Sequence, residues 1–235
     1  MMNEMKKIPK KYQPKGYEIL YEDQDLFVGN KAPGFLTVGA AWERLNTIHQ
    51  ALNMYVRKGS AVSRKRVFVV HRLDQDTSGV LIFAKSEKIQ YLLKEDWKNT
   101  VKTYYAVVYG QLPRQSGTIS SYLLEDDDYV VHSVEHHPHA KLSHTEYEVV
   151  MENDKFSLLK INLLTGRKNQ IRVHLADLGY PVVGDEKYGK TDKRHSRYLA
   201  LHAYSIEFTH PFTKQRLKFD APVPEYFKKL ISYAY

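Results

Sequence analysis

A polar segment, residues 71–79, lies between two short runs of β-branched and aromatic residues at 67–70 and 80–84. Such runs are typical of buried strands, so the segment predicts the turn of a buried hairpin with Asp74 at the rim of a sheet. Two interpretations of the polar residues remain open. Asp, Thr, Ser and Gly are ordinary turn formers whose side chains bond their own backbone. A carboxylate beside the permanent cation of Arg72 is also a candidate catalytic group.

Strands are expected to outnumber helices in this chain. A turn at 31–34 is expected to lead into a hairpin strand, and the strand-like runs lie at 17–28, 35–38, 104–109, 145–151, 156–163 and 198–208. Amphipathic helices are expected at 45–56, beginning near Thr47, and after Ser86, which can act as an N-cap. There is no regular βαβ alternation. The predicted fold class is therefore α+β, with a mixed, mainly antiparallel sheet and flanking helices.

The length of 235 residues is enough for one large domain or two small subdomains. Residues 1–16 contain five lysines and two prolines and are expected to form a basic, flexible tail. Residues 17–235 show no repeat or low-complexity linker, and we expect them to form one domain.

Composition narrows the class of partner. Lys and Arg number 35 against 27 Asp and Glu, which gives a formal charge of +8 and favours a polyanionic partner. Cysteine is absent, which excludes disulfides and thiolate zinc sites and is compatible with a reducing cytosol. No stretch approaches the ~18 apolar residues of a membrane span. A soluble, unexported, cytoplasmic protein with no membrane partner and no obligate protein partner is expected.

A second polar constellation occupies residues 165–175, where a strand is expected to end and a helix to begin. Gly166 frees the backbone, Asn169 can cap the helix, and Gly179 can end it. Basic side chains surround the expected helix N-terminus, which suits a phosphate or a carboxylate. The same side chains can equally face solvent, because cations there oppose the helix dipole. They are Arg167, Lys168 and Arg172.

Three segments, in order, resemble the motifs of the RluA-type pseudouridine synthases. Residues 71–79 match the family pattern His-Arg-Leu-Asp, two variable residues, Thr-Ser-Gly without a gap. Residues 102–110 are similar to Lys-x-Tyr-x-Ala-x-Val-x-Gly, with Tyr104 at the position of the active-site tyrosine. Residues 166–175 are similar to Gly-Arg-Thr-His-Gln-Ile-Arg-Val-His-Leu, with Lys-Asn in place of Thr-His. The resemblance covers residues 17–227.

The resemblance implies an isomerase that needs no metal and no cofactor and converts a specific uridine in structured RNA, rRNA and/or tRNA, to pseudouridine. It implies the pseudouridine synthase fold with a central catalytic cleft that receives a flipped nucleotide. Asp74 is expected to attack the sugar C1′ or help form a glycal, Arg172 to pair with Asp74, and Tyr104 to cover the base. Substrate contacts are expected from His71, Arg72, Thr77, Arg167, Lys168 and Gln170.

Two alternatives remain. A non-catalytic RNA-binding protein would explain the charge and the 18 tyrosines, which can stack on bases, but not the settings of Asp74 and Arg172. Five histidines within residues 132–144 could bind a divalent metal. Because Pro138 breaks any helix there, a solvated loop, or an edge that faces RNA, is the favoured interpretation. The sequence does not identify the target uridine.

Overall fold

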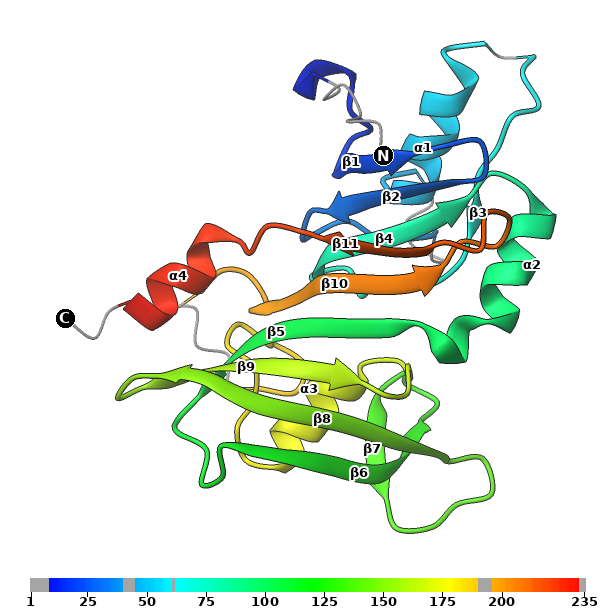
Figure 1. Cartoon of the computed structure of the whole chain (residues 1–235). Coiled ribbons are helices and arrows are strands. Elements are labelled where there is room, and N and C mark those ends of the chain that lie inside the picture. Colours follow the sequence, from blue (N-terminus) through cyan, green and yellow to red (C-terminus); the bar gives the residue numbers. More distant parts are fainter. Residues whose placement is uncertain (1–8, 40–44, 61, 190–195, 233–235) are drawn as a thin grey trace. The chain divides into compact units, whose positions relative to one another are not determined.

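The computed structural model describes residues 9–39, 45–60, 62–189 and 196–232 (Figure 1). The chain forms two compact units. Unit 1 consists of Met1–Thr100 and Ser205–Ala221, and unit 2 consists of Val101–Tyr204 and Pro222–Tyr235. Each unit is therefore built from two separate stretches of the chain. No helix in the described part of the chain combines the length and the hydrophobicity that a membrane span requires.

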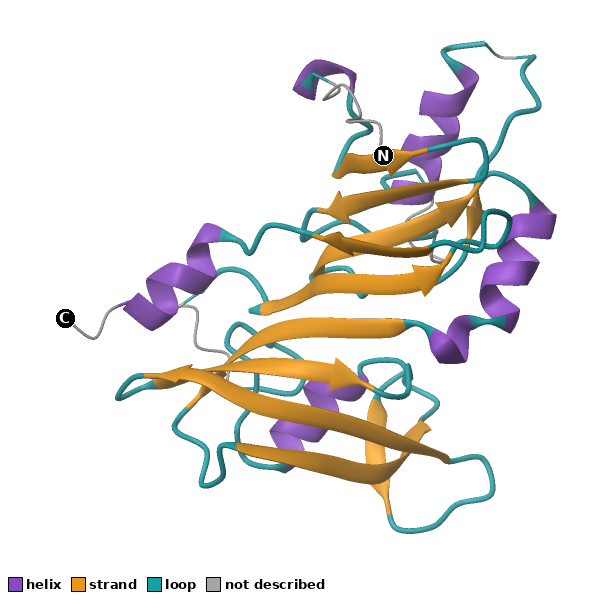
Figure 2. Cartoon of the chain, viewed as in Figure 1, coloured by secondary structure: helices purple, strands orange, loops and turns teal. Residues whose placement is uncertain are grey.

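Unit 1 is built on a sheet in which β4 is the central strand (Figure 2). The order is β1-β2-β4-β10-β11, and β3 also pairs with β4. The pairs β1–β2, β2–β4, β3–β4 and β10–β11 are antiparallel. The strands are β1 (Tyr17–Glu22), β2 (Leu26–Lys31), β3 (Phe68–Val69), β4 (Ser78–Ala84), β10 (Leu201–Thr209) and β11 (Arg216–Asp220). Only the part of β10 from Ser205 onward belongs to unit 1.

All seven residues of β4 are buried, which explains why its sequence is a continuous apolar run rather than an alternating one. Its side chains join Leu26 and Val28 of β2 and Ile206 and Phe208 of β10 in one core cluster. Because β3 and β4 are antiparallel, the residues between them form the loop of a hairpin, as predicted, in which β4 is buried and β3 is half-buried. The Asp74 segment therefore leads directly into the buried strand β4.

The helices of unit 1 begin at the residues that the sequence predicts. They are α1 (Ile48–Arg57) and α2 (Glu87–Glu95), with short 3₁₀ turns η1 (Lys10–Tyr12) and η2 (Trp97–Asn99). Thr47 caps α1 by accepting a hydrogen bond from the backbone N–H of Gln50 at 3.1 Å. Ser86 caps α2 in the same way, through the N–H of Ile89 at 3.3 Å.

Unit 2 contains a second set of antiparallel strands in the order β5-β9-β8-β6-β7. They are β5 (Val101–Tyr109), β6 (Ser116–Glu125), β7 (Val131–Val134), β8 (Lys141–Glu152) and β9 (Phe156–Leu163). Helix α3 (Gln170–Asp177) packs against β6, β7 and β8, and α4 (Glu225–Ser232) packs against β5 and β9. A small core of Leu123, Val131 and Val173 joins α3 to the strands. The α+β class and the mainly antiparallel pairing are confirmed.

Three local predictions differ from the structure. Residues 35–38 do not form a strand, and only Leu36 makes an isolated bridge, to Thr47. The backbone carbonyls of Leu36 and Thr37 instead accept hydrogen bonds from the N–H groups of Ile48 and His49 at the start of α1. The histidine-rich segment is only partly a loop, since His132 belongs to β7 and His144 to β8. The sequence reading also missed β6, β7, β11 and α4.

The expected N-terminal tail falls into two parts. Residues 1–8 lie outside the described residues. The following part packs on unit 1: the side chain of Gln13 accepts a hydrogen bond from the N–H of Ile19 at 2.8 Å, and the carbonyl of Gly16 accepts one from Ala32 at 2.9 Å. These contacts add residues 13–16 to the folded part of the chain.

Candidate active site

The loop between β3 and β4 holds Asp74 in a tight turn. The backbone N–H of Thr77 donates to the carbonyl of Asp74 at 3.2 Å, which closes the turn. Just before it, Leu73 is buried, and the Thr37 hydroxyl bonds both its carbonyl (2.8 Å) and its N–H (3.1 Å). Asp74 itself is half-buried. A carboxylate on a turn fixed from both sides has little freedom to move, which suits a group that must meet a reacting atom.

Lys31 is the residue of this site that the sequence analysis missed. It ends β2 and is fully buried, and its Nζ donates to the carbonyls of Ala32 (2.9 Å), Phe35 (2.8 Å) and Gln75 (2.8 Å). Gln75 directly follows Asp74, so Lys31 ties the turn to the β2 strand. Burial lowers the pKa of Lys31 to about 7, although the nearby carboxylates of Asp76 and Asp74 oppose this shift. Lys31 is therefore a buried lysine with a lowered pKa whose amine binds the backbone of the Asp74 turn.

The other expected contacts of this loop differ in exposure. The Nε2 of His71 accepts a hydrogen bond from the backbone N–H of Ile82 at 3.1 Å, and its ring lies 4.7 Å from that of Trp97, so His71 fixes the loop to β4. Arg72 is exposed. Thr77 is 2% exposed, and its hydroxyl has no hydrogen-bond partner among the described residues. A buried hydroxyl without a partner is costly unless something binds it.

Tyr104 lies on β5 in unit 2, opposite Ile161 of β9. Its side chain is 9% exposed. The strand is held in place by backbone bonds from Val107 to the carbonyl of Ala200 (2.9 Å) and from Val183 to the carbonyl of Val107 (2.8 Å). A tyrosine in this setting presents a rigid ring, because its backbone is paired on a sheet.

The third motif folds as predicted at the level of the backbone but not of the cap. Asn169 occupies the N-cap position of α3 with a left-handed backbone (φ 51°), yet its side chain makes no capping bond. Its Oδ1 accepts from the hydroxyl of Tyr188 at 3.2 Å instead. The neighbouring Gln170 instead binds the loop before the helix, because its Oε1 accepts from the N–H of Arg167 at 3.0 Å.

Gln170 is 2% exposed, and four hydrogen bonds satisfy its amide within unit 2. Its Oε1 also accepts from the Thr165 hydroxyl (2.8 Å), and its Nε2 donates to the carbonyl of His144 and the hydroxyl of Thr145 (both 2.9 Å). A primary amide has two donors and one oxygen with two lone pairs, so this set is complete. These hydrogen bonds favour a structural role for Gln170, which joins the loop before α3 to β8.

Arg172 forms a bidentate ion pair with a buried carboxylate, Asp185. Its Nε lies 2.7 Å from Oδ2 and one terminal nitrogen lies 2.8 Å from Oδ1. Asp185 also accepts from the N–H groups of Lys187 (2.9 Å) and Tyr188 (3.0 Å). Burial alone would raise the pKa of Asp185, but the hydrogen bond and charge of Arg172 lower it overall. Asp185 therefore orients the guanidinium, and this planar fork is a geometry that arginine provides and lysine does not.

The two other basic residues of the motif are exposed. Lys168 contacts the carboxylate of Glu125 and donates to the carbonyl of Tyr129 at 3.0 Å. Arg167 has no ion pair with any residue that the structure describes. Of the three cations in the motif, Arg167 is the one whose charge is not already compensated.

His174, the motif's histidine, serves the fold. It is fully buried, with Nδ1 2.9 Å from the Thr145 hydroxyl and Nε2 3.0 Å from the Ser121 hydroxyl. Burial lowers the pKa of His174 to about 4, partly opposed by Asp177. The imidazole is therefore neutral at physiological pH and joins α3 to β6 and β8.

Among the residues that the structure describes, one group of side chains has ligand atoms close enough for a metal. Asp23, Asp25 and His210 place one atom each within 4.8 Å of one another. The Nδ1 of His210 accepts from the N–H groups of Phe212 (3.2 Å) and Thr213 (3.1 Å), so the proton of a neutral ring is on Nε2 and points at Asp23, 3.1 Å away. These hydrogen bonds explain the group without a metal, because they join the β1–β2 turn to the β10–β11 turn.

Comparison with known proteins identifies the family. A family model described as RNA pseudouridylate synthase matches residues 25–177. Ribosomal large subunit pseudouridine synthase C of Vibrio vulnificus is 33% identical over 223 residues, which is 91% of this chain and 68% of the relative. The dual-specificity RNA pseudouridine synthase RluA of the same organism is 34% identical over 202 residues, 83% of this chain and 78% of the relative.

The fold agrees. The solved structure of human RNA Pseudouridylate Synthase Domain Containing 4 superposes with a TM-score of 0.75 and 23% identity, covering 91% of each chain. This places the α+β sheet among pseudouridine synthase folds, while the sequence matches carry the function. The chain belongs to the RluA-type family of RNA pseudouridine synthases and is an isomerase that acts on RNA.

Proposed function

We propose that this enzyme isomerises one specific uridine of a structured RNA, rRNA and/or tRNA, with Asp74 as its nucleophile. The observation that carries the proposal is the fixed turn in which Lys31 and Thr37 hold the backbone on both sides of Asp74. Such preorganisation favours attack on an atom whose position is set by the rest of the site. A cytoplasmic location follows from the proposed RNA substrate.

In the proposed reaction the C1′–N1 bond of the target uridine breaks and a C1′–C5 bond forms. The Asp74 carboxylate attacks C1′, or assists formation of a glycal, and the uracil leaves with the electron pair of the broken bond. After the ring turns, C5 bonds to C1′ and displaces the Asp74 carboxylate; on the glycal route, C2′ instead regains the proton that it lost. The proton at C5 is then lost and N1 gains one. The atoms balance without an oxidant or a reductant, so no redox cofactor is required.

The remaining residues take supporting roles in this proposal. Tyr104 covers the uracil ring while it is detached, as a rigid aromatic surface can. Arg172, oriented by Asp185, stabilises negative charge during bond cleavage. The Thr77 hydroxyl, buried and without a partner among the described residues, is available to bind the flipped nucleotide.

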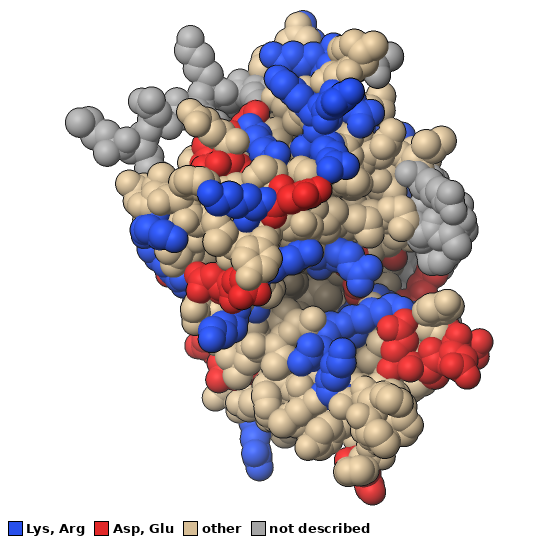
Figure 3. Space-filling view, turned by 90° about the vertical axis from the view of Figure 1, so that its right-hand side faces the viewer, with Lys and Arg blue, Asp and Glu red and all other residues tan. Residues whose placement is uncertain are grey.

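The RNA class follows from relatives and charge. One relative is named for the large ribosomal subunit and another for dual specificity. The formal charge of +8 favours a polyanion, and Lys and Arg side chains stand in several groups on the face drawn in Figure 3. Mapping pseudouridines across total RNA from a strain that lacks the gene, with and without the cloned gene, identifies the uridine as the site that disappears and returns.

The nucleophile is tested by Asp74→Asn, an isosteric change on a turn. We expect no pseudouridine from this variant, with thermal stability and RNA affinity close to wild type. Asp76→Asn is the matched control, because Asp76 is an exposed carboxylate in the same loop. Turnover of Asp74→Asn within about tenfold of wild type, a loss of only ~1.4 kcal/mol, is incompatible with a nucleophilic role for Asp74 and would assign that role to another group.

A further inference from the structure

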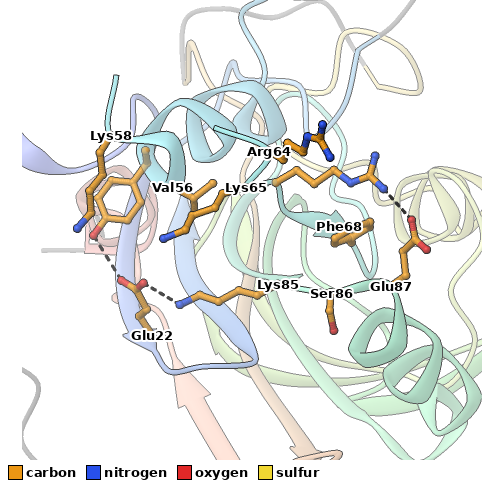
Figure 4. Close-up of a pocket in the computed structure, with 11 residues that line it drawn as sticks. Glu22, Val56, Lys58, Arg64, Lys65, Phe68, Lys85, Ser86 and Glu87 are labelled. Carbon is orange, nitrogen blue, oxygen red and sulfur yellow. Dashed lines mark hydrogen bonds and ion pairs between the residues drawn. The ribbon is translucent and has the colours of Figure 1, made fainter. Parts of the chain in front are cut away.

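Unit 1 contains a basic cavity that the reaction does not use. Its volume is about 880 Å³, and five cationic side chains line it: Lys58, Arg64, Lys65, Arg66 and Lys85 (Figure 4). They come from the end of α1, the loop that follows it and the end of β4. Two carboxylates, Glu22 and Glu87, also reach the cavity, so its lining has an excess of three positive charges.

The carboxylates compensate only part of this charge. Glu22 lies 2.8 Å from the Nζ of Lys85, and Glu87 lies 2.9 Å from Arg66. The charged groups of the other three cations, Lys58, Arg64 and Lys65, make no ion pair with any residue in the described ranges. Figure 4 shows the Lys65 side chain among the residues that line the cavity. Uncompensated cations gathered around a hollow concentrate positive potential there.

The cavity wall also contains apolar surface. Phe68 and Val56 line it, and the guanidinium of Arg66 lies 5.0 Å above the Phe68 ring. A stacked arginine is held in one orientation, and such side chains bind phosphate oxygens through several N–H donors. Cations beside an aromatic ring are a combination that suits the backbone and bases of RNA.

The cavity is separate from the Asp74 turn. Strand β4 begins at Ser78, shortly after Asp74, and ends at Ala84, next to Lys85 of the cavity. At about 3.3 Å per residue the strand places these two features roughly 20 Å apart within unit 1. A ligand of the cavity is therefore not the nucleotide that reacts, but an RNA of even modest size can reach both.

We propose that this cavity is a second RNA-docking site, which binds phosphodiester groups of the substrate RNA at a distance from the target uridine. The inference rests on the proposed function, since it assigns the ligand to the same RNA. Each phosphate held there fixes the register of the RNA without reading its bases. Such a contact raises affinity and leaves the chemical step unchanged.

The test removes the three uncompensated cations together, in the variant Lys58→Met/Arg64→Met/Lys65→Met. The matched control is Lys88→Met/Lys94→Met/Lys98→Met, which removes three exposed lysines from α2 and η2 and the same total charge. The probe is a fluorescein-labelled RNA stem–loop, titrated at several KCl concentrations. The single charge reversal Lys65→Glu provides a second variant if the triple variant does not fold.

We expect the cavity variant to bind the stem–loop at least tenfold more weakly. The slope of log K against log salt should fall in magnitude by about 2 to 3, near 0.7 to 0.9 for each phosphate contact. The control should stay within about threefold of wild type. At saturating RNA, the cavity variant should form pseudouridine at the wild-type rate on the RNA identified by the deletion strain.

Two results would overturn the docking site. One is wild-type affinity and slope in the cavity variant and in Lys65→Glu. The other is an equal loss in the control, which would assign the effect to total charge. The binding measurement does not depend on catalysis. If the wild-type protein forms no pseudouridine, the proposed function is refuted, whereas the docking site is tested only by the affinity and the salt slope of the cavity variant.

Discussion

Replacing Lys31 with Met tests the support beneath the Asp74 turn. Met is close to Lys in length and apolar, so the change removes the three Nζ hydrogen bonds and adds little strain. The carbonyls of Ala32, Phe35 and Gln75 then lose their donor. At pH 9 the Lys31 amine, with a pKa of about 7, is neutral and donates two hydrogens; because each unpaired buried carbonyl costs about 1 kcal/mol or more, we expect the variant to lose about 2 kcal/mol of unfolding free energy at this pH.

This loss should depend on pH, with a sign set by the lowered pKa of Lys31. The folded protein has a pKa of about 7 at this residue, against the ordinary value of 10.5 in the unfolded chain. Between these values the unfolded state binds more protons, so the wild-type unfolding free energy rises with pH by up to about 1.4 kcal/mol per pH unit. The Met variant lacks this proton. The difference between the two proteins should therefore widen by about 2 kcal/mol from pH 7 to pH 9.

The assay is urea unfolding of both proteins at pH 7, 8 and 9, with equal m-values as the check on two-state behaviour. Lys160→Met is the matched control, because Lys160 is an exposed lysine on β9 and should show no such change. A difference between wild type and Lys31→Met that stays constant within about 0.5 kcal/mol over this range would refute the reasoning, since Lys31 would then remain protonated in the fold. Pseudouridine formation by Lys31→Met should fall by about a hundredfold, the cost of a small displacement of a reacting group.

Three further substitutions and one chelator treatment test the proposed chemistry. Thr77→Val should leave the unfolding free energy within about 1 kcal/mol of wild type, because no hydrogen bond among the described residues is lost. The same change should lower the single-turnover rate at least tenfold. A normal rate would show that Thr77 does not bind the substrate. Arg172→Met should lower the single-turnover rate roughly a hundredfold at saturating RNA. The control is Arg172→Met/Asp185→Asn, which also removes the charge of the buried carboxylate that the first change leaves without its ion-pair partner. Lys168→Met should mainly weaken RNA binding and reduce the slope of log K against log salt by about one. A normal saturated rate in both Arg172 variants would exclude the electrostatic role. Activity should survive EDTA on an RNA whose fold needs no divalent ion, and loss that zinc restores would favour a metal enzyme instead.

The sequence predicted the features that depend on local pattern. Caps at Thr47 and Ser86, the buried run of β4 and the turn at Asp74 all follow from residues close together in the chain. Such signals work because caps and turns are set by interactions over a few residues. The fold class followed from the balance of strand-like and helical patterns.

Features that depend on distant contacts were not predicted. Lys31 bonds a carbonyl 44 residues away, and nothing next to it in the sequence indicates that it is buried. The bonds from the Gln170 amide to the His144 carbonyl and the Thr145 hydroxyl, 26 and 25 residues away, were not predicted either. Strand β6 was missed because its side chains are mostly polar and half-exposed, so its pairing with β8 decides its conformation.

The arrangement of unit 1 along the chain has a consequence for synthesis. Its first stretch is complete at Thr100, but β10 and β11 follow only after about 100 residues of unit 2. At 5–20 residues per second, a ribosome exposes β4 without its β10 neighbour for roughly 5 to 20 seconds. An apolar strand with an open edge is a template for pairing with other chains. During this interval, before β10 pairs with β4, chaperone binding to the nascent enzyme competes with aggregation.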